Sequence, residues 1–298
     1  MNVWINKPNL VNFSVSKLKF YDIYQIVRTI NMSLDRQTVV VIAFYISLVY
    51  TVMFVTNSGH AQIDPDTIVG AWLFDEGKGK VAEDLSGGQH HGKLEKGPKW
   101  VKGQSGQALE FDGGNYVELE NSAPDLHFGD VEPFTISVWV NPQPGGTIIG
   151  KFNGGVIGAY ILEVLGGGNV VFHREVAPWG LFADQIVPPK DKFSHITATY
   201  DGSEMKVYVN GEISGQQPRV GQNKDAATPV LVGARFQGGN PSNFYKGIID
   251  DLALFNVALG KAEIQTLIAA GLPSVLGLIV EPEDRLATAW ATLKLGRQ

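Results

Sequence analysis

Two adjacent carboxylates, Asp250 and Asp251, stand in the middle of the apolar run YKGIIDDLALFNVAL. Side chains alternate between the two faces of a β-strand, so the pair cannot act together on one bond. Alternation puts Asp250 on the same face as Ile248, Leu252 and Leu254. We therefore expect Asp250 to point inward and Asp251 to face solvent or a partner. A buried carboxylate is costly unless it is paired, hydrogen-bonded or metal-bound, so Asp250 should anchor either a turn or a metal ion.

Other polar residues offer little for catalysis. Hydrolysis of a glycosidic bond needs two carboxylates that flank it, and Glu163 and Glu175 lie on neighbouring strand candidates, although cross-strand acids are more often surface residues. The adjacent His90 and His91 point apart on an extended chain, which argues against a zinc site. His195 begins a strand and should satisfy a hydrogen bond there. The sequence also has no Gly-x-Ser-x-Gly elbow and no phosphate-binding loop.

Two segments could bind a ligand, because they combine aromatic and polar side chains. A sugar ring stacks on an exposed aromatic side chain while polar groups fix its hydroxyls. The segment HREVAPWGLFADQ supplies Trp179, Phe182, His173 and Arg174, and the segment ARFQGGNPSNFY supplies Arg235, Phe236, Asn240, Asn243 and Tyr245. The alternative is that these aromatic side chains fill the ends of the sheets, since aromatic residues are generally buried.

Composition restricts the class of protein. The chain has 298 residues, a formal net charge of −6, 35 glycines and no cysteine. Without cysteine there are no disulfides and no thiolate metal ligands. The acidic balance and the lack of a basic stripe exclude a nucleic-acid footprint. Glycines placed singly and in pairs between short apolar runs are typical of a β protein with many turns.

The first 61 residues predict a leader rather than a folded domain. Residues 38–55 form an uncharged apolar run, Arg36 precedes it, and Gly59 and Ala61 occupy the −3 and −1 positions of a cleavage site. We expect a signal peptide cleaved after Ala61 and a secreted or surface-displayed protein. The run is also long enough for an uncleaved membrane anchor. Met32 gives a leader of ordinary proportions, so we hypothesise that translation starts there. Without residues 1–61 the chain keeps 19 basic and 28 acidic residues.

The rest of the chain predicts an all-β domain. At least ten short apolar runs are separated by glycine, proline or Asp-Gly and Asn-Gly turn signals every 8–12 residues or so, as in a β-sandwich or barrel. In FTISVWVNP, Phe134, Ile136, Val138 and Val140 share one face. One helix, KAEIQTLIAAGLP, closes the domain, and residues 273–298 form a tail with a second amphipathic stretch. The predicted boundaries are 1–61, 62–272 and 273–298.

Five phrases in order carry a family resemblance: GAWLFDEGKG…EDLSGGQHHGKL, GQALEFDGGNYVEL, FTISVWVNP, HITATYDGSEMKVYVNGE and KGIIDDLALFNVALGKAEI. Together they resemble the LamG-like jelly-roll domains of the concanavalin A-like lectin/glucanase superfamily. The resemblance implies a sandwich of two curved antiparallel sheets, in agreement with the strand count.

The resemblance also implies a structural calcium ion. Asp250 matches the aspartate of the last strand that commonly binds it, and backbone oxygens around Asp75 and the turn that ends at Gly114 are its expected companions. Calcium takes 6–8 oxygen ligands and accepts backbone carbonyls. Asp84, in EDLSGG, could be a further ligand, but an aspartate before Ser-Gly-Gly usually forms a turn.

Three functions follow from these features. The first is a non-catalytic binding module for carbohydrate. The second is a protein–protein or adhesion module, as many laminin-G-like domains are. The third is a glycan-degrading enzyme, which is disfavoured because the Glu-x-Asp-x-x-Glu strand motif of the superfamily's glucanases is absent. Expected partners are therefore a glycan or an extracellular protein, with membrane contact only through an uncleaved leader.

Overall fold

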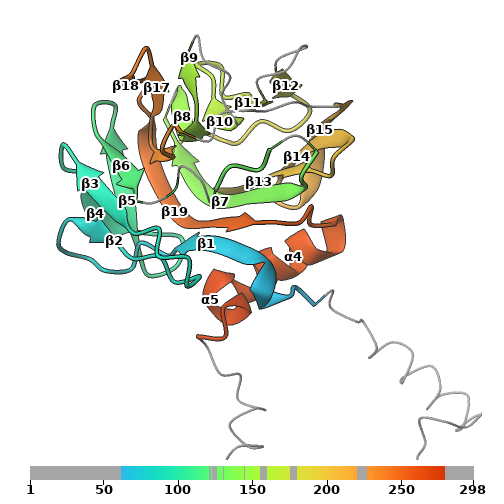
Figure 1. Cartoon of the computed structure of the whole chain (residues 1–298), viewed down its shortest axis with the longest axis horizontal. Helices are drawn as coiled ribbons and strands as arrows, with labels where there is room; N and C mark the ends of the chain where they lie inside the picture. Colours follow the sequence, from blue (N-terminus) through green and yellow to red (C-terminus); the bar gives the residue numbers. More distant parts are fainter. Residues whose placement is uncertain are drawn as a thin grey trace, which may run out of the picture. The chain divides into compact units, whose positions relative to one another are not determined.

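A computed structural model describes residues 62–278, apart from 121, 123–125, 130, 144, 155–159, 175–179 and 220–226. This part of the chain is a sandwich of two antiparallel β-sheets, as the sequence predicts (Figure 1). The predicted leader, the start at Met32 and the helix of the C-terminal tail lie outside the described residues. Between residues 62 and 278, no described helix has the length and apolar character needed to span a membrane.

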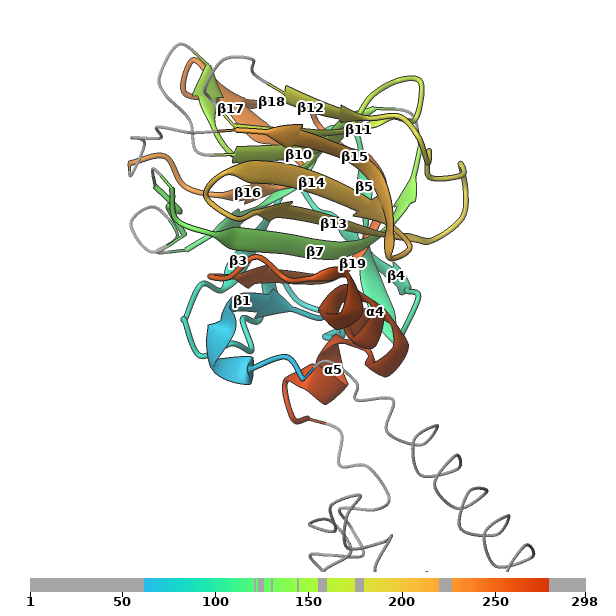
Figure 2. The same cartoon turned by 90° about the vertical axis from the view of Figure 1, so that its right-hand side faces the viewer.

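Sheet A has the strand order β15-β14-β13-β7-β19-β5-β4, and β1 also pairs with β19. Its strands are β1 (Ile68–Trp72), β4 (Lys99–Lys102), β5 (Gln107–Asp112), β7 (Phe134–Pro142), β13 (Ser194–Tyr200), β14 (Glu204–Val209), β15 (Glu212–Pro218) and β19 (Lys246–Phe255). Figure 2 shows β7, β13, β14 and β15 side by side in this sheet. A short 3-10 helix, η2 (Pro65–Thr67), precedes β1.

Sheet B has the order β12-β11-β10-β8-β16-β6-β3-β2. Its strands are β2 (Val81–Ala82), β3 (Gly92–Glu95), β6 (Tyr116–Leu119), β8 (Gly146–Lys151), β10 (Tyr160–Val164), β11 (Val170–His173), β12 (Gly180–Ala183) and β16 (Leu231–Val232). A third, small sheet contains β9 (Asn153–Gly154), β17 (Arg235–Gln237) and β18 (Asn240–Ser242).

The core lies between sheets A and B and follows the predicted alternation. Phe134, Ile136, Val138 and Val140 of β7 are fully buried in one hydrophobic cluster. Thr135, Ser137 and Trp139 alternate with them on the opposite face. A slip of one residue would turn the whole apolar set away from the other sheet. The prediction of an all-β jelly roll is therefore confirmed.

The predicted helix is present as α4 (Lys261–Ala270), followed by the short α5 (Leu272–Val275). The Glu263 carboxylate accepts a hydrogen bond from the Gly260 backbone N–H at 2.7 Å, which caps the first turn. Ile264 and Leu267 pack with Phe255 in a second hydrophobic cluster. Figures 1 and 2 show both helices beside β1 and β19, so α4 and α5 cover part of the outer face of sheet A.

The prediction for Asp250 and Asp251 is wrong in its orientation. Ile249 pairs with the core residue Val140, and Asp250 pairs with Trp139 on the opposite face. A register shift follows, and Asp251 has a φ of +45°. This bulge adds one residue to β19 and reverses the alternation after it, so Ile249 and Leu252 both reach the core. Both carboxyl groups are buried, with Asp251 only 6% exposed. Asp250 lies on the face of sheet A that turns away from sheet B.

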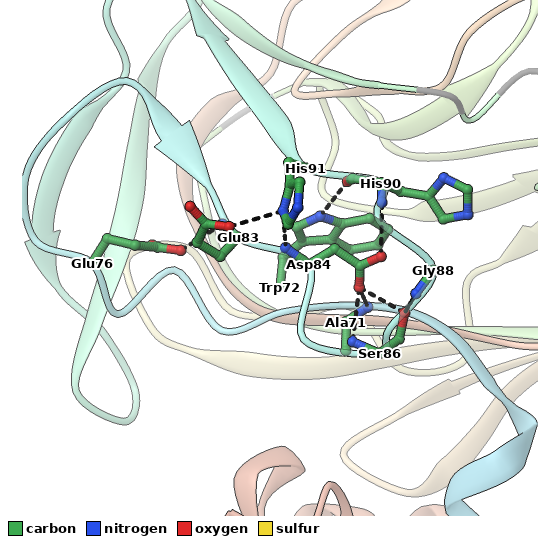
Figure 3. A network of polar contacts seen from close by, with 9 residues as sticks. All are labelled: Ala71, Trp72, Glu76, Glu83, Asp84, Ser86, Gly88, His90 and His91. Atoms are coloured by element: carbon green, nitrogen blue, oxygen red, sulfur yellow. Dashed lines mark hydrogen bonds and ion pairs between the residues drawn. The ribbon is translucent and has the colours of Figure 1, made fainter.

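Asp84 forms a turn, as its sequence context favours, and it organises the loop between β2 and β3 (Figure 3). One carboxylate oxygen accepts hydrogen bonds from the Ala71 N–H, the Ser86 N–H and the Ser86 hydroxyl, at 2.7–3.0 Å. The other accepts from the His90 N–H at 3.0 Å. The His90 carbonyl accepts from the Trp72 indole, which joins the loop to the core. The rings of His90 and His91 point in different directions, so they do not chelate one ion.

His195 is a buried histidine held by two hydroxyl groups. Its Nε2 lies 2.9 Å from Ser137 Oγ and its Nδ1 lies 3.2 Å from Thr197 Oγ1. The ring packs edge-on against Trp139 at 5.1 Å between centroids. Burial lowers the pKa of His195 to about 3, because the charged form loses its water. His195 is therefore a structural residue of the outer face of sheet A, as its position at a strand start predicts.

We predict that Asp84→Ala lowers the free energy of unfolding by about 3 kcal/mol, because the buried Ala71 and His90 N–H groups lose their acceptor. Urea denaturation measures the change, and Asp184→Ala, at an exposed position, is the control. Equal stability of the two variants would contradict the role assigned to Asp84.

We also predict a loss of stability in acid that depends on His195. Between pH 6.5 and 3 the unfolded chain binds a proton on this histidine and the folded protein does not. The free energy of unfolding should therefore fall by about 1.4 kcal/mol for each pH unit from this group as the pH drops through that window. In His195→Gln the slope should be shallower by about one proton, and an unchanged slope would contradict the prediction.

Candidate functional site

The outer face of sheet B carries a row of side chains from three strands. Glu163 of β10 pairs with Val171 of β11, which pairs with Phe182 of β12. His173 is on the same face, two residues along β11. The intervening side chains of these strands are in the core. Phe182 is 61% exposed, an unusual state for a phenylalanine on a sheet, and so offers an apolar ring to a ligand.

Polar side chains meet next to this row. Glu163 Oε2 accepts a hydrogen bond from Asn243 Nδ2 at 2.7 Å and lies 3.6 Å from a terminal nitrogen of Arg235. Asn243 Nδ2 also lies 2.9 Å from Thr147 Oγ1. The Arg235 guanidinium lies over the Phe152 ring at 5.3 Å. The Phe152 ring in turn contacts the His173 ring edge-on at 6.1 Å. The contacts therefore form one chain from His173 to Thr147.

We call these residues the sheet B cluster: Thr147, Phe152, Glu163, His173, Phe182, Arg235 and Asn243. Arg235 compensates the charge of Glu163, and both side chains are partly exposed, at 26% and 13%. Arg235 Nε is buried and has no hydrogen-bond partner among the described residues. A carboxylate, an amide and a guanidinium held beside aromatic rings can donate to and accept from the hydroxyl groups of an uncharged ligand.

Four of the predicted ligand-binding residues come together in this cluster: His173, Phe182, Arg235 and Asn243. Sequence reasoning missed Phe152 and Thr147. The segment GTIIGKF that contains them reads as an ordinary buried strand, and only the tertiary contacts reveal that Thr147 and Phe152 meet Asn243 and Arg235. The sequence did indicate Glu163, but as half of a possible catalytic pair with Glu175. Glu175 lies outside the described residues.

Arg174 is not available to an external ligand, contrary to the prediction. It is fully buried, and its guanidinium lies over the rings of Tyr200 at 4.2 Å and Phe134 at 5.1 Å. One terminal nitrogen donates to the Phe128 carbonyl at 3.2 Å. Adjacent residues of a strand point to opposite faces, so Arg174 enters the core where His173 faces outward.

The remaining predicted residues lie apart from the cluster. Phe236 and Asn240 belong to the hairpin of β17 and β18, where Phe236 is half-buried and Asn240 is exposed. The Asn240 side chain donates to the Gly238 carbonyl at 3.3 Å and so supports its own turn. Tyr245 is buried against Phe111 in the core. Trp179 lies outside the described residues.

A second feature is an acidic cluster on the outer face of sheet A. Asp250 Oδ2 accepts the backbone N–H groups of Gln104 and Ser105 at 2.8 and 3.2 Å, while its buried Oδ1 has no partner in the described part of the chain. Burial raises the pKa of Asp250 to about 7 and that of Asp251 to about 8. Asp75 adds to both shifts by its charge and accepts the Gln107 N–H at 2.7 Å.

Backbone oxygens crowd the same place. A Cβ atom at Gly103 would lie 2.4 Å from Asp250 Oδ2, 2.6 Å from the Gln107 carbonyl and 2.8 Å from the Ser105 carbonyl. Glycine is therefore required at position 103. No set of three or more histidine, aspartate or glutamate side chains among the described residues is arranged to hold a metal ion. A cation here would have to take backbone oxygens as well, which suits calcium better than zinc.

Gly114 is not part of this cluster, although the sequence suggested that it was. Gly114 is two residues after Asp112, and Asp112 pairs with Lys246 of β19. Asp250 is four residues further along the same strand, or about 13 Å at the usual rise. The glycine loop that reaches Asp250 is instead that of residues 103–107, between β4 and β5.

Two clefts lie outside both clusters. The larger, of about 330 Å³, is lined by Pro142, Gln143, Val164, Gly166, Gly167, Gly168, Val187, Pro188, Pro189 and Lys190. The smaller, of about 220 Å³, lies over sheet A and also reaches Gln143. The larger cleft offers mostly apolar side chains and backbone. Neither contains a member of the sheet B cluster, so the polar and aromatic groups that could fix a ligand lie elsewhere.

Comparison with known proteins identifies the family. A family model described as the concanavalin A-like lectin/glucanases superfamily matches residues 111–265, which is more than half of the chain. The chain belongs to this superfamily. The match runs from the end of β5 into α4 and includes every strand that contributes to the sheet B cluster. No curated protein matches the sequence.

Several solved structures share the fold. Domain 4 of AbnA, an extracellular arabinanase from Geobacillus stearothermophilus solved with arabinotriose, has a TM-score of 0.53 at 19% identity, over 68% of this chain and 98% of that domain. The binding domain of Paraclostridial Mosquitocidal Protein 1 has a TM-score of 0.53 at 16% identity, over 68% of this chain and 52% of that one. The binding domain of botulinum neurotoxin serotype G has a TM-score of 0.51 at 14% identity, over 68% of this chain and 50% of that one. At these identities the likeness shows the fold alone, and this chain spans about half the length of the two toxin domains.

Proposed function

We propose that this protein is a non-catalytic carbohydrate-binding module and that the glycan binds at the sheet B cluster. The observation that carries the proposal is the contact of Glu163 with both Asn243 and Arg235, on the same face as an exposed phenylalanine two strands away. The arabinotriose bound to the arabinanase domain of the same fold supports it.

The chemistry of the cluster suits sugar hydroxyls. A pair of neighbouring hydroxyls can donate to Glu163 and accept from Arg235 at once. Asn243 can accept through its Oδ1, because its two N–H donors bond to Glu163 and Thr147. The apolar face of a sugar ring can cover Phe182, which would remove its ring from water. The ion pair and the contact of Arg235 with Phe152 already hold the guanidinium in place, so less side-chain entropy is lost on binding.

The same contacts disfavour hydrolysis. A glycosidase uses one carboxyl group as an acid and a second as base or nucleophile. Glu163 instead accepts from Asn243 and pairs with Arg235, which suits a fixed acceptor of hydrogen bonds. The glucanase strand motif is also absent from the sequence. Recognition of a protein is the second candidate, because two toxin domains that share the fold are described as binding domains without a named sugar.

We further propose that the protein acts outside the cell, either released by cleavage after Ala61 or held by the uncleaved apolar run. We also propose that the acidic cluster binds calcium. Asp250 Oδ1, which has no partner in the described part of the chain, the Asp251 carboxyl group and the carbonyls of residues 105 and 107 together form an oxygen-rich site. A bound cation would favour the ionised form of both aspartates.

We predict that Phe182→Ala and Glu163→Gln each weaken glycan binding at least tenfold, because they remove the stacking surface and the charged acceptor. A glycan array followed by calorimetry on the best oligosaccharide measures this. Asn240→Ala, at an exposed residue outside the cluster, is the control. Binding of no glycan by the wild type, together with capture of a protein receptor, would replace this function with the second candidate.

We predict that excess calcium raises the melting temperature relative to chelator, because a ligand of the folded state adds about 2.7 kcal/mol at 100 times its Kd. Asp250→Asn should lose this response. It should also melt higher than the wild type in chelator, because the variant removes one of two neighbouring buried carboxyl groups. Asp184→Asn is the control, and equal melting of the wild type with calcium and with chelator would count against the site.

A further inference from the structure

The sheet B cluster continues across the sheet through residue 244. Phe244 follows Asn243 directly and forms a parallel bridge with Thr147. Its ring lies 6.2 Å from that of Tyr116 on β6, at a tilt of 42°. The Lys96 ammonium group lies over both rings, 5.2 Å from the centre of Phe244 and 5.9 Å from that of Tyr116. The two aromatic rings therefore hold a cation beside the cluster.

The fold presents Lys96 to solvent. It stands in the turn between β3 and β4, where Lys96 and Gly97 both have positive φ, of 58° and 73°. The residue is exposed. Contact with the faces of two rings restrains the ammonium group without neutralising it. Lys96 is thus a cation held in position and open on its outer side.

Lys96 differs from its neighbours in charge compensation. Lys93 pairs with Glu95 at 2.5 Å and Arg235 pairs with Glu163 at 3.6 Å. In the part of the chain that the structure describes, no carboxylate lies within 4.0 Å of the Lys96 ammonium group. Burial raises the pKa of the Tyr116 hydroxyl, and the charges of the nearby Glu95 and Glu118 raise it further, while Glu95 also pairs with Lys93. Among the described residues, Lys96 is therefore a cation without an ion-pair partner on a surface that also carries carboxylates.

The two places lie within reach of one oligosaccharide. Glu163 is on β10 and Tyr116 on β6, which are separated by β8 and β16. Three strand spacings of about 4.8 Å correspond to about 14 Å. This distance exceeds one sugar ring and suits a chain of several rings lying across the strands.

We infer that Lys96, with Tyr116 and Phe244, is a subsite for an anionic substituent, a carboxylate or a sulfate, on an oligosaccharide whose uncharged part occupies the sheet B cluster. The inference rests on the proposed glycan binding. Residues 62–298 carry an excess of acidic groups, 28 against 19 basic ones. A polyanion is repelled by that excess, whereas one anion close to Lys96 feels mainly the local cation, because salt screens charges beyond about 8 Å. The expected ligand is thus an oligosaccharide with one or a few acidic groups, and not a polyanion.

The test uses the protein with a glycan array that prints acidic oligosaccharides beside their carboxyl-reduced or desulfated counterparts. The wild type should bind the acidic member of a pair about tenfold more tightly at 50 mM NaCl, with a smaller preference at 200 mM. Lys96→Gln should lose the preference and keep the binding of the uncharged member. Lys96→Arg should keep both, and Lys192→Gln, an exposed lysine elsewhere, is the control.

The outcomes separate the two proposals. A wild type that binds both members of every pair equally, or a preference that survives in Lys96→Gln, overturns the anionic subsite and leaves glycan binding standing. Binding of no printed glycan overturns both. If the preference is confined to carboxylated pairs, the substituent is a uronic or similar acid. If it is confined to sulfated pairs, the substituent is a sulfate ester.

Discussion

The sandwich depends on β19, which pairs with two different strands along one of its edges. One edge of this strand pairs with β7, while the other pairs with β5 through residues 246–249 and with β1 through residues 252–255. The bulge at Asp250 and Asp251 lies between the two halves. An extra residue there bends the strand and changes its twist, which allows a single strand to join two different neighbours.

The acidic cluster follows from that junction. Where β5 ends its pairing and β1 has not begun, backbone groups of the strand edge have no ladder partner. The loop of residues 103–107 and Asp75, just after β1, come together at this gap. N–H groups of the loop donate to the carboxylates of Asp250 and Asp75. Burial then raises the pKa values of Asp250 and Asp251. Two buried carboxyl groups beside converging carbonyls make an oxygen-rich arrangement, which is the kind of ligand set that the proposed calcium ion requires.

The outer face of sheet B differs from this acidic cluster, because its polar side chains are partly exposed and contact one another. Glu163 and Arg235 form an ion pair there, and the Phe152 ring contacts the Arg235 guanidinium. Helices cover part of the outer face of sheet A, whereas on sheet B Phe182 stays exposed. A surface of fixed polar groups and open aromatic rings is suited to binding a sugar chain.

The sequence by itself determined the local features. Apolar alternation in FTISVWVNP, the turn residues and the cap at Gly260 each specify their element through contacts within a few residues, and the strands, the helix α4 and the sandwich were predictable for that reason. Only the tertiary structure decided what adjacent residues face. One extra residue in β19 reversed the orientation expected for Asp250, and Arg174 entered the core beside an outward His173. Likewise, Thr147, Glu163 and Asn243 meet because β8, β10 and the segment before β19 lie together in space. Register shifts and contacts between distant strands arise from the packing of the whole sheet, so a local sequence pattern does not predict them.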